Sequence, residues 1–415
     1  MRRLLSSAAS AAMHAQPAPR RVLIVGGGLT GSSLAAQLPR ELLRRATVLE
    51  KSGSPGRVAV SLPRGAAKGS AAADLGAQYF TAYDARSAAE LEALEARGIV
   101  ARMPRDSISG ARAGSDAHAH YVARSGGTAR VVDDHFMRSA EEAGASVRRH
   151  TRLEALFKER GRWRAVLAPG EKGGAAAAAP AAEDDLFFDA VVLTIPAPQV
   201  LQLGGDVPAA LAASGAAARL ASVAYSSRLV LALYLPPSAA ALWAACPWVG
   251  RFVARDEPGG AVVRYLSFES RKRRLGGDED GEGGEGGGGD ARAGEDCIAF
   301  VAHSTVEFGA LHENTPDFQA ALAPQLVEAA CAALAHAAGL PALPAAPVET
   351  RLHRWKYSQV VPSSEIKGGE GDEAGAIAVS TEPLLILAGD YVTTSNLAGC
   401  LRSAAAAAAL IGPSP

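Results

Sequence analysis

Val22-Leu-Ile-Val-Gly-Gly-Gly-Leu-Thr-Gly31 is the stretch that decides the fold. Its four apolar residues predict a buried strand, and Gly26, Gly28 and Gly31 follow in the G-x-G-x-x-G pattern that opens a helix. In such sites the first glycine permits a tight turn, the second lets the backbone approach a pyrophosphate, and the third lets helix and strand pack closely. The phosphates lie at the helix N-terminus, where N–H groups face them. The stretch therefore predicts a dinucleotide-binding loop.

A second apolar run completes this unit. Ala46 to Leu49 ends in Glu50, nineteen residues after Gly31, where the dinucleotide fold places an acid for the ribose hydroxyls of adenosine. Pro39 interrupts the intervening helix, so we expect a short helix, a kink and a second turn from residue 40 to 44. A glycine-rich loop that binds nothing is the alternative, and the strand before it and the acid after it argue against that alternative.

Composition limits the class of protein. The chain has 415 residues, 48% of them hydrophobic, which is enough for two or three domains with a sizeable core. A net charge of −1 gives no overall attraction to nucleic acid or to an anionic membrane, so we expect no nucleic-acid partner. No run of eighteen apolar residues occurs, so we expect no membrane span. The oligomeric state does not follow from these numbers.

The N-terminal segment has a composition of its own. Residues 1–20 carry arginines and serines, and no acid precedes Glu41. A mitochondrial or plastid transit peptide and a disordered tail both fit this pattern. The protein is accordingly expected either in the cytoplasm or in one of those organelles.

The pattern of strands and helices divides the chain into two domains of an α/β protein. Residues 21–82, 122–206 and 378–415 predict a nucleotide-binding domain built from both ends of the chain, because the apolar run from Leu384 to Ala388 delivers Asp390 as the first unit delivers Glu50. Residues 83–121 and 207–377 predict an inserted α+β domain on a mixed or antiparallel sheet, since several strands follow one another with few helices. We expect disordered inserts at 170–185, 276–296 and 366–376.

Two groups of cations are candidate phosphate ligands. Arg57 follows a turn-rich stretch and would pair bidentately with a phosphate, and the alternative is a solvated loop arginine. The run Arg271-Lys-Arg-Arg274 could steer a phosphorylated substrate, but we favour a solvated turn beside the acidic insert that follows it.

Six motifs together resemble the renalases, within the wider group of FAD-dependent amine-oxidase-like flavoproteins. They are the stretches 22–31, 74–79, 192–203, 225–228, 354–360 and 389–400. The resemblance runs from about Val22 to Ile411, interrupted by the three inserts, and several of its motifs are peculiar to that family. It implies a Rossmann-type FAD-binding domain with an inserted substrate domain on a mixed sheet.

The resemblance also implies which residues contact the cofactor, a non-covalently bound FAD. It places Gly389 and Asp390 beside the flavin half of the pyrophosphate, and the helix after Asn396 with its positive end towards the flavin ring. The further contacts that it implies are Thr30, Arg57, Gln78, Tyr79 and, near the adenine, Leu153.

From the substrate domain, the resemblance implies that His303 faces the flavin. Without the resemblance, a histidine on a strand is usually a hydrogen-bonded core residue. Two positions depart from the family pattern: Pro55 stands in place of a glycine, and Phe252 stands where a renalase can carry tyrosine. Both bear on the expected substrate contacts and leave the expected flavin contacts in place.

Other reactive side chains have simpler interpretations. Cys246, Cys297, Cys331 and Cys400 show no metal-ligand spacing, so we interpret them as reduced core residues. For Cys400 a covalent flavin bond is the alternative to a packed thiol, which we favour. His118 and His120 alternate without an acid or cysteine beside them, so no metal site is predicted.

The activity implied is oxidation of misplaced dihydronicotinamides, isomers of NADH or NADPH reduced at ring position 2 or 6. Hydride would pass to flavin N5, and dioxygen would reoxidise the flavin and yield hydrogen peroxide. This chemistry needs positioning more than side-chain catalysis, which agrees with a sequence that shows no triad or carboxylate pair. Neither the ring isomer nor the choice between NAD and NADP follows.

Two alternatives from other classes stay open. One is a flavin amine oxidase or desaturase, in which aromatic side chains surround a substrate amine. The candidate aromatic residues are Trp248, Phe252, Tyr265 and Trp355. The other alternative is a non-catalytic flavin-binding scaffold, for which Pro55 and Phe252 are the only support.

Overall fold

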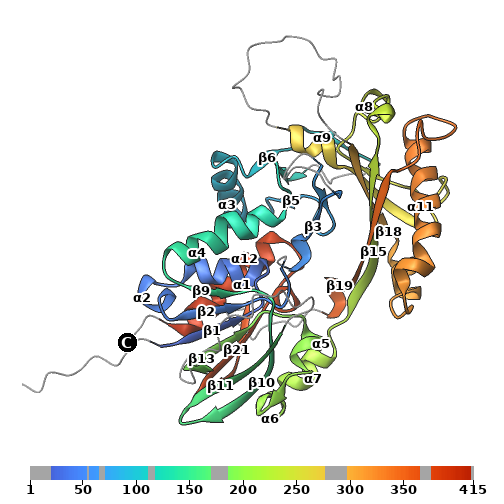
Figure 1. The fold of residues 1–415 in the computed structure, drawn as a ribbon. Coiled ribbons are helices and arrows are strands. Elements are labelled where there is room, and N and C mark those ends of the chain that lie inside the picture. Colours follow the sequence, from blue (N-terminus) through green and yellow to red (C-terminus); the bar gives the residue numbers. More distant parts are fainter. Residues whose placement is uncertain are drawn as a thin grey trace, which may run out of the picture.

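Two six-stranded sheets dominate the computed structural model (Figure 1). It describes residues 20–53, 56–64, 71–110, 117–169, 186–275, 297–364 and 375–412. Pro55, nearly all of the N-terminal segment, the inserts 170–185 and 276–296, and most of 366–376 lie outside these ranges, so the expectations about them are untested.

The first sheet is a mostly parallel, Rossmann-type sheet. Its strand order is β20-β21-β13-β1-β2-β9, and the edge strand β20 runs antiparallel to its neighbour. The strands are β1 (Val22–Val25), β2 (Ala46–Leu49), β9 (Ser146–Arg148), β13 (Ala190–Leu193), β20 (Ala376–Thr381) and β21 (Leu384–Ala388). Strands from both ends of the chain therefore meet in one sheet, as the sequence predicts.

Both faces of this sheet are covered, which is why β1, β13 and β21 are apolar throughout. Val22 and Ile24 pack on one face, against residues of the helices there, and Leu23 and Val25 pack on the other. The helices of the first face are α1 (Leu29–Gln37), α12 (Leu397–Ile411), the π-helix η3 (Val131–Met137) and α4 (Arg138–Glu142). α1 ends before Pro39 and a separate turn, α2 (Arg40–Leu43), follows, as predicted.

A smaller sheet and three short helices cover the second face (Figure 1). The sheet consists of β12 (Phe187–Phe188), β11 (Arg162–Pro169), β10 (Thr151–Glu159) and β14 (Gly204–Gly205). The helices are α5 (Ala197–Val200), α6 (Val207–Ala213) and α7 (Ala216–Ala221). Although α6 and α7 follow residue 206, where the sequence predicts the change of domain, α6 packs against β10, β14 and β20 of the nucleotide-binding half.

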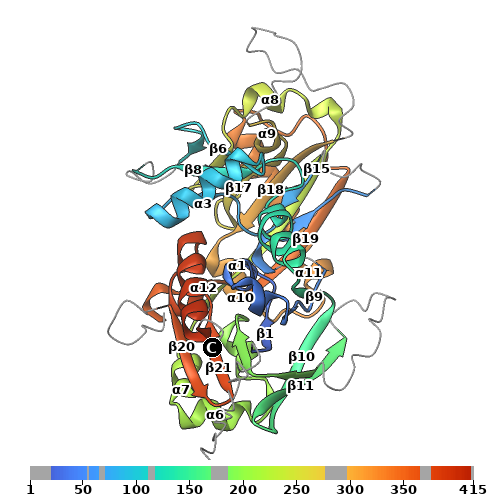
Figure 2. The ribbon, with the colours of Figure 1, turned by 90° about the vertical axis from the view of Figure 1, so that its left-hand side faces the viewer.

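The second six-stranded sheet is mixed, as predicted, with the order β19-β15-β18-β17-β16-β7. All its pairs are antiparallel except β16 with β7. The strands are β7 (Ile108–Ser109), β15 (Tyr225–Leu235), β16 (Gly250–Phe252), β17 (Val263–Phe268), β18 (Ile298–Ser304) and β19 (Glu349–Val360). Figure 2 shows this sheet in the upper half of the molecule and the nucleotide-binding sheet in the lower half.

The two faces of this sheet meet different parts of the chain. Leu229 and Leu231 pack towards α11 (Phe318–Ala337), whereas Val230 and Ala232 pack towards β4 (Ala73–Asp74) of the nucleotide-binding half. α9 (Glu269–Arg274) follows β17, and α8 (Leu242–Ala245) and α10 (Val306–Leu311) lie beside the same sheet. The second sheet is therefore in contact with the first half through its Val230 face.

α11 is the one helix in the described part of the chain that is long and apolar enough to cross a membrane, by length and composition alone. It packs against β17 and β19 and buries Leu322, Leu326 and Leu334 in the core beneath the sheet. A core helix of this kind passes the same test, so the observation is weak support for a membrane span.

Several shorter elements accompany the two six-stranded sheets. β5 (Phe80–Thr81), β8 (His120–Ala123) and β6 (Val100–Arg102) form a three-stranded sheet, and α3 (Ala85–Ala96) lies between β5 and β6 in the chain. β3 (Val60–Ser61) pairs with β4. The elements η1 (Gly56–Val58) and η7 (Asp390–Val392) are single 3₁₀ turns.

Candidate active site

One large cavity, of about 1960 Å³, lies between the two halves and is lined by both. Pockets for drug-sized ligands measure roughly 300–1,000 Å³, so this one has room for more than a single ligand of that size. All but one of the site residues predicted from sequence line it. They are Gly26, Gly28, Thr30, Glu50, Arg57, Gln78, Tyr79, Leu153, Phe252, His303, Gly389, Asp390 and Asn396.

The exception, Gly31, has a packing role. A Cβ atom at Gly31 would lie 1.9 Å from the carbonyl oxygen of Gly26, so only glycine lets α1 approach β1 this closely. Gly26 has a φ of +107°, which other residues rarely adopt, whereas a Cβ at Gly28 would meet nothing within 4 Å. Gly28 is also the N-cap of α1 and supplies no side chain to that helix end. The loop thus has the geometry of a phosphate-binding turn.

Glu50 is buried at the end of β2, and its carboxylate is held by the backbone. Its Oε2 accepts a hydrogen bond of 2.9 Å from the Gly27 amide, and its Oε1 accepts from the amide and hydroxyl of Ser52 at 2.9 and 2.7 Å. These bonds tie the glycine loop to β2. Contact with a ribose stays a prediction.

Arg57 and Asp390 join the two ends of the chain across the cavity. The Arg57 Nη1 lies 2.6 Å from Oδ2 of Asp390 and donates a second bond, of 3.1 Å, to the carbonyl of Ser358 in β19. The hydroxyl of Ser395 also donates to Asp390. Burial by itself would raise the pKa of Asp390, but the charge of Arg57 and these hydrogen bonds hold that pKa below its ordinary value. Pairing of Arg57 with a phosphate stays a prediction.

The N-terminus of α12 opens on the same cavity. Asn396 is its N-cap, with Oδ1 accepting a 2.8 Å bond from the amide of Gly399. Cys400, one turn on, is a free and buried thiol, and burial raises its pKa to about 11. The thiol is therefore protonated at neutral pH, which agrees with a packed side chain.

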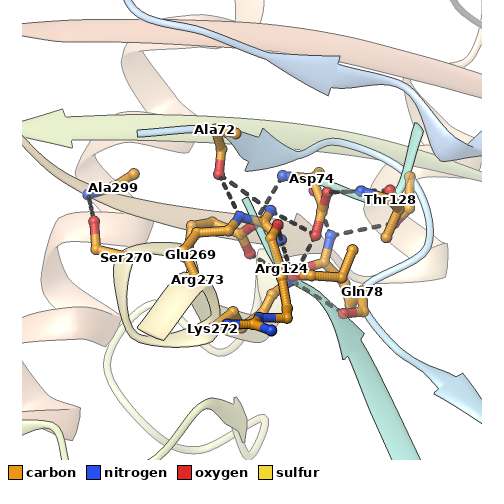
Figure 3. A network of polar contacts seen from close by, with 12 residues as sticks. Ala72, Asp74, Gln78, Arg124, Thr128, Glu269, Ser270, Lys272, Arg273 and Ala299 are labelled. Carbon is orange, nitrogen blue, oxygen red and sulfur yellow. Dashed lines mark hydrogen bonds and ion pairs between the residues drawn. The ribbon is translucent and has the colours of Figure 1, made fainter. Parts of the chain in front are cut away.

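Gln78 is held in place by a buried network of charges, the Asp74 cluster, which consists of Asp74, Glu269, Lys272 and Arg273 (Figure 3). The Lys272 ammonium lies 3.1 Å from Asp74 and 2.8 Å from Glu269, and it donates to the backbone and side-chain oxygens of Gln78 at 3.0 and 3.1 Å. Arg273 lies 2.7 Å from Asp74 and 2.8 Å from Glu269. The cluster thereby fixes the Gln78 segment against α9.

This cluster contradicts the expectation of a solvated turn at residues 271–274. Lys272 is only 1% exposed, and its run is the helix α9 rather than a turn. The physical reason is that Asp74 and Glu269 supply two buried carboxylates, so the cations are compensated away from water. Burial by itself would raise the pKa of Asp74, but the charges of Arg273 and Lys272 and a bond from the Thr128 amide lower it to about 2.

The substrate half of the cavity presents aromatic rings and a neutral imidazole. Tyr265 lies between Phe252 and His303, with ring centroids 5.0 and 6.1 Å away. Burial, followed by the charges of Arg228 and Lys272, lowers the pKa of His303 to about 3, so its ring is uncharged at neutral pH. Its Nε2 is buried and has no hydrogen-bond partner in the described part of the chain.

The other aromatic residues and histidines considered in the sequence lie in different places. Trp355 lines the cavity and donates a 2.6 Å bond to the carbonyl of Leu75, whereas Trp248 packs in the core beside Phe268 and does not line the cavity. His120 packs against a ring of the site, Tyr79, rather than pairing with His118. Among the described residues no cluster of three or more side chains could hold a metal ion.

The sequence interpretation gave no role to four cations that line the substrate half: Arg228, Arg264, Arg354 and Lys356. Three of them lie inside the long strands β15 and β19. A charged residue in the interior of a predicted strand is the sequence signal that could have identified them.

This chain is similar in sequence to known dinucleotide-binding proteins. The family of NAD(P)-binding Rossmann-like domains matches residues 24–92. Renalase of Mus musculus is 29% identical over 393 residues, which span 92% of this chain and 96% of that protein.

Two solved structures share the fold. A protein from Exiguobacterium sp. 255-15, provisionally named a protoporphyrinogen oxidase, covers 94% of this chain and 98% of its own length, with a TM-score of 0.54 and 15% identity. An oxidoreductase from Methanosarcina mazei covers 93% and 99%, with a TM-score of 0.54 and 9% identity. At these identities the two structures show the fold alone. The chain is thus similar to renalase over nearly its whole length, and this similarity, together with the Rossmann-like domain, supports a flavin oxidoreductase.

Proposed function

We propose that this protein is an FAD-dependent oxidase of misplaced dihydronicotinamide dinucleotides, converting 2- or 6-dihydro isomers of NADH or NADPH to the aromatic dinucleotide and dioxygen to hydrogen peroxide. One observation carries the choice of substrate. The described lining of the substrate half contains flat rings and an uncharged His303 but no carboxylate. An amine is protonated at neutral pH and would enter without a counter-ion, whereas a dihydronicotinamide ring is neutral.

The described residues fit a bound FAD. A Cβ atom at Gly28 would meet no protein atom within 4 Å, so the backbone there is accessible to a pyrophosphate. Glu50 lies at the position that holds an adenosine ribose in this fold. The N-termini of α1 and α12 both line the cavity, so two helix dipoles favour anionic groups there. Bound FAD would accept the hydride and pass the electrons to dioxygen.

The residues of the substrate half have positioning roles in this proposal. With a pKa of about 3, His303 is a poor proton donor or acceptor at neutral pH, so its role in this proposal is to orient the substrate ring. Tyr265 keeps its proton as well, because burial raises the pKa of its phenol well above the ordinary value. The rings of Phe252 and Tyr265, tilted by 60° to each other, supply aromatic faces against which a nicotinamide can pack.

The test is an anaerobic stopped-flow record of flavin absorbance after the purified protein is mixed with 2- and 6-dihydro isomers of NAD(P). Ordinary NADH and simple amines are the controls. Fast bleaching by the isomers alone, followed by peroxide when air is admitted, is the expected result. Bleaching by amines alone would establish an amine oxidase instead, and a bound flavin that neither class reduces would leave a flavin-binding scaffold.

A further inference from the structure

Four cations line the cavity on the side away from its acids. Arg228, Arg264, Arg354 and Lys356 line its substrate half, and none of them forms an ion pair with a described residue. We propose that these four side chains, the cation wall, are a second phosphate site that binds the phosphate groups of a dinucleotide substrate. The inference rests on the proposed function and assigns the part of the substrate that lies away from the reacting ring.

The acids of the cavity cannot serve as partners for this wall. Three acids occur among the described lining residues, Glu50, Glu154 and Asp390, and all belong to the nucleotide-binding half. Glu50 is bonded to the Gly27 and Ser52 amides, Asp390 is paired with Arg57, and Glu154 lies 3.0 Å from Arg152. Glu307, outside the lining, acts on Arg228 through its charge but forms no ion pair with it. The described lining of the substrate half therefore carries a net positive charge that an anionic ligand would neutralise.

The cations are held in fixed positions by neutral groups. The Arg228 Nη1 donates a 3.1 Å bond to the carbonyl of Ser304, and the Arg264 Nη1 donates a 2.6 Å bond to the carbonyl of Val253. The guanidinium of Arg264 also lies 5.3 Å from the ring centre of Phe252. A guanidinium carries five N–H donors, so these contacts fix its place and leave most donors for a ligand.

The other two cations are anchored in the same way, along β19. The Arg354 Nη1 donates a 2.8 Å bond to the carbonyl of Thr315, and its guanidinium lies 4.3 Å from the ring centre of Phe318, which also lines the cavity. The Lys356 ammonium lies 3.1 Å from the side-chain oxygen of Asn314. A guanidinium anchored like that of Arg354 loses little freedom when a phosphate binds, whereas the exposed Lys356 contributes its charge.

The place of the wall relative to the aromatic pocket suits a dinucleotide. In the sheet, Arg228 lies opposite Trp355, while Val230, two residues further along β15, lies opposite His303. The phosphate ligands thus begin within two strand positions of the residues that face the reacting ring. The cavity volume of about 1960 Å³ accommodates such a substrate in addition to FAD.

The test measures binding separately from turnover. Calorimetry of the FAD-loaded protein with NAD⁺ and with ADP-ribose would compare the wild type with Arg228→Gln, Arg354→Gln and a control, Arg138→Gln, whose arginine pairs with Asp134 on the opposite half. We expect each wall variant to bind both probes about tenfold or more weakly, because each loses a charge-assisted contact to phosphate, and the control to bind as the wild type does.

A kinetic arm separates phosphate contacts from packing. With the dihydro dinucleotide, the wall variants should raise KM and leave kcat within about twofold, whereas with the phosphate-free dihydronicotinamide riboside neither constant should change. Arg228→Lys and Arg354→Lys should recover part of the affinity, because the charge is retained but not the two-pronged geometry.

The outcomes distinguish this inference from the proposed function. Equal losses with dinucleotide and riboside, or wall variants that bind ADP-ribose like the wild type, would overturn the second phosphate site while leaving the oxidase activity standing. So would a wild type that binds neither probe. Arginine-dependent binding of ADP-ribose in a protein that no dihydronicotinamide isomer reduces would keep the site and overturn the proposed function.

Discussion

Two groups of cations in this protein, the Asp74 cluster and the cation wall, differ in their surroundings. Lys272 and Arg273 of the Asp74 cluster are buried with two carboxylates within 3.1 Å. The cation wall lines an open cavity, and its members touch only carbonyl oxygens, an amide oxygen and aromatic rings in the described structure. The cations of the cluster come from one basic run, residues 271–274, whereas those of the wall come from three separate strands. The difference shows that partners from distant parts of the chain decide whether a cation is structural or available to a ligand.

The Asp74 cluster has a clear structural consequence. Asp74 comes from β4 of the nucleotide-binding half, and Glu269, Lys272 and Arg273 come from α9 beside the second sheet. Figure 3 shows these side chains converging with Gln78 at the contact between the halves. The cluster therefore couples the segment expected to meet the flavin to the sheet that carries His303.

The largest expected effect comes from breaking this cluster. Lys272→Met leaves Asp74 and Glu269 buried with one cation instead of two, and removing one partner of a buried ion pair costs about 3–5 kcal/mol. Arg354→Met, in the cation wall, should cost only about 1–2 kcal/mol, since it loses one cation–π contact and one hydrogen bond to the Thr315 carbonyl. Urea unfolding of the FAD-loaded variants measures both, and similar losses would show that the two groups do not differ in their structural role.

A smaller effect should appear in acid. Because the pKa of Asp74 is lowered to about 2, its contribution to stability is complete above its unfolded pKa of about 3.9 and is lost as the pH falls through 2. At pH 3 the wild type should have lost on the order of 1 kcal/mol relative to Asp74→Asn, compared with pH 6. Urea midpoints of the two proteins at both pH values test this, and a constant difference between them would contradict the prediction.

The sequence allows the nucleotide-binding unit to be predicted almost residue by residue, because its signals are local. The glycine loop, Glu50, Pro39 and the strand before Asp390 each lie within one strand–helix unit. The Asp74 cluster could not be predicted in this way, since Asp74 and Lys272 are 198 positions apart and burial of the pair depends on how the halves pack. The bond between Arg57 and Asp390 spans 333 positions and escaped prediction for the same reason.

Salt should weaken the binding of a phosphate-bearing substrate to the cation wall. Charges that line an open cavity are screened as the Debye length falls from about 10 Å at 0.1 M salt to about 3 Å at 1 M. We expect KM for the dihydro dinucleotide to rise several-fold over this range, and KM for the phosphate-free riboside to stay constant. In Arg228→Gln the dependence on salt should be shallower. A salt effect of equal size on both substrates would indicate a general effect on the protein rather than on the cation wall.

The smallest expected effect is on the pKa of His303, which one cation from each group, Arg228 and Lys272, lowers. Burial contributes most to the low pKa of its imidazole, and the charges of Arg228 and Lys272 lower it further, while Asp74 raises it. Arg228→Gln should therefore raise the pKa of His303 from about 3 and still leave it below the ordinary 6.5, because burial remains. The ring signals of ¹³C-labelled histidine, assigned with His303→Asn, would follow this titration in the FAD-loaded protein. Since the imidazole stays neutral above pH 6 in both proteins, kcat should not change with pH through this group between pH 6 and 8, and a His303 that titrates near neutrality in the wild type would contradict both its neutral state and the influence of Arg228.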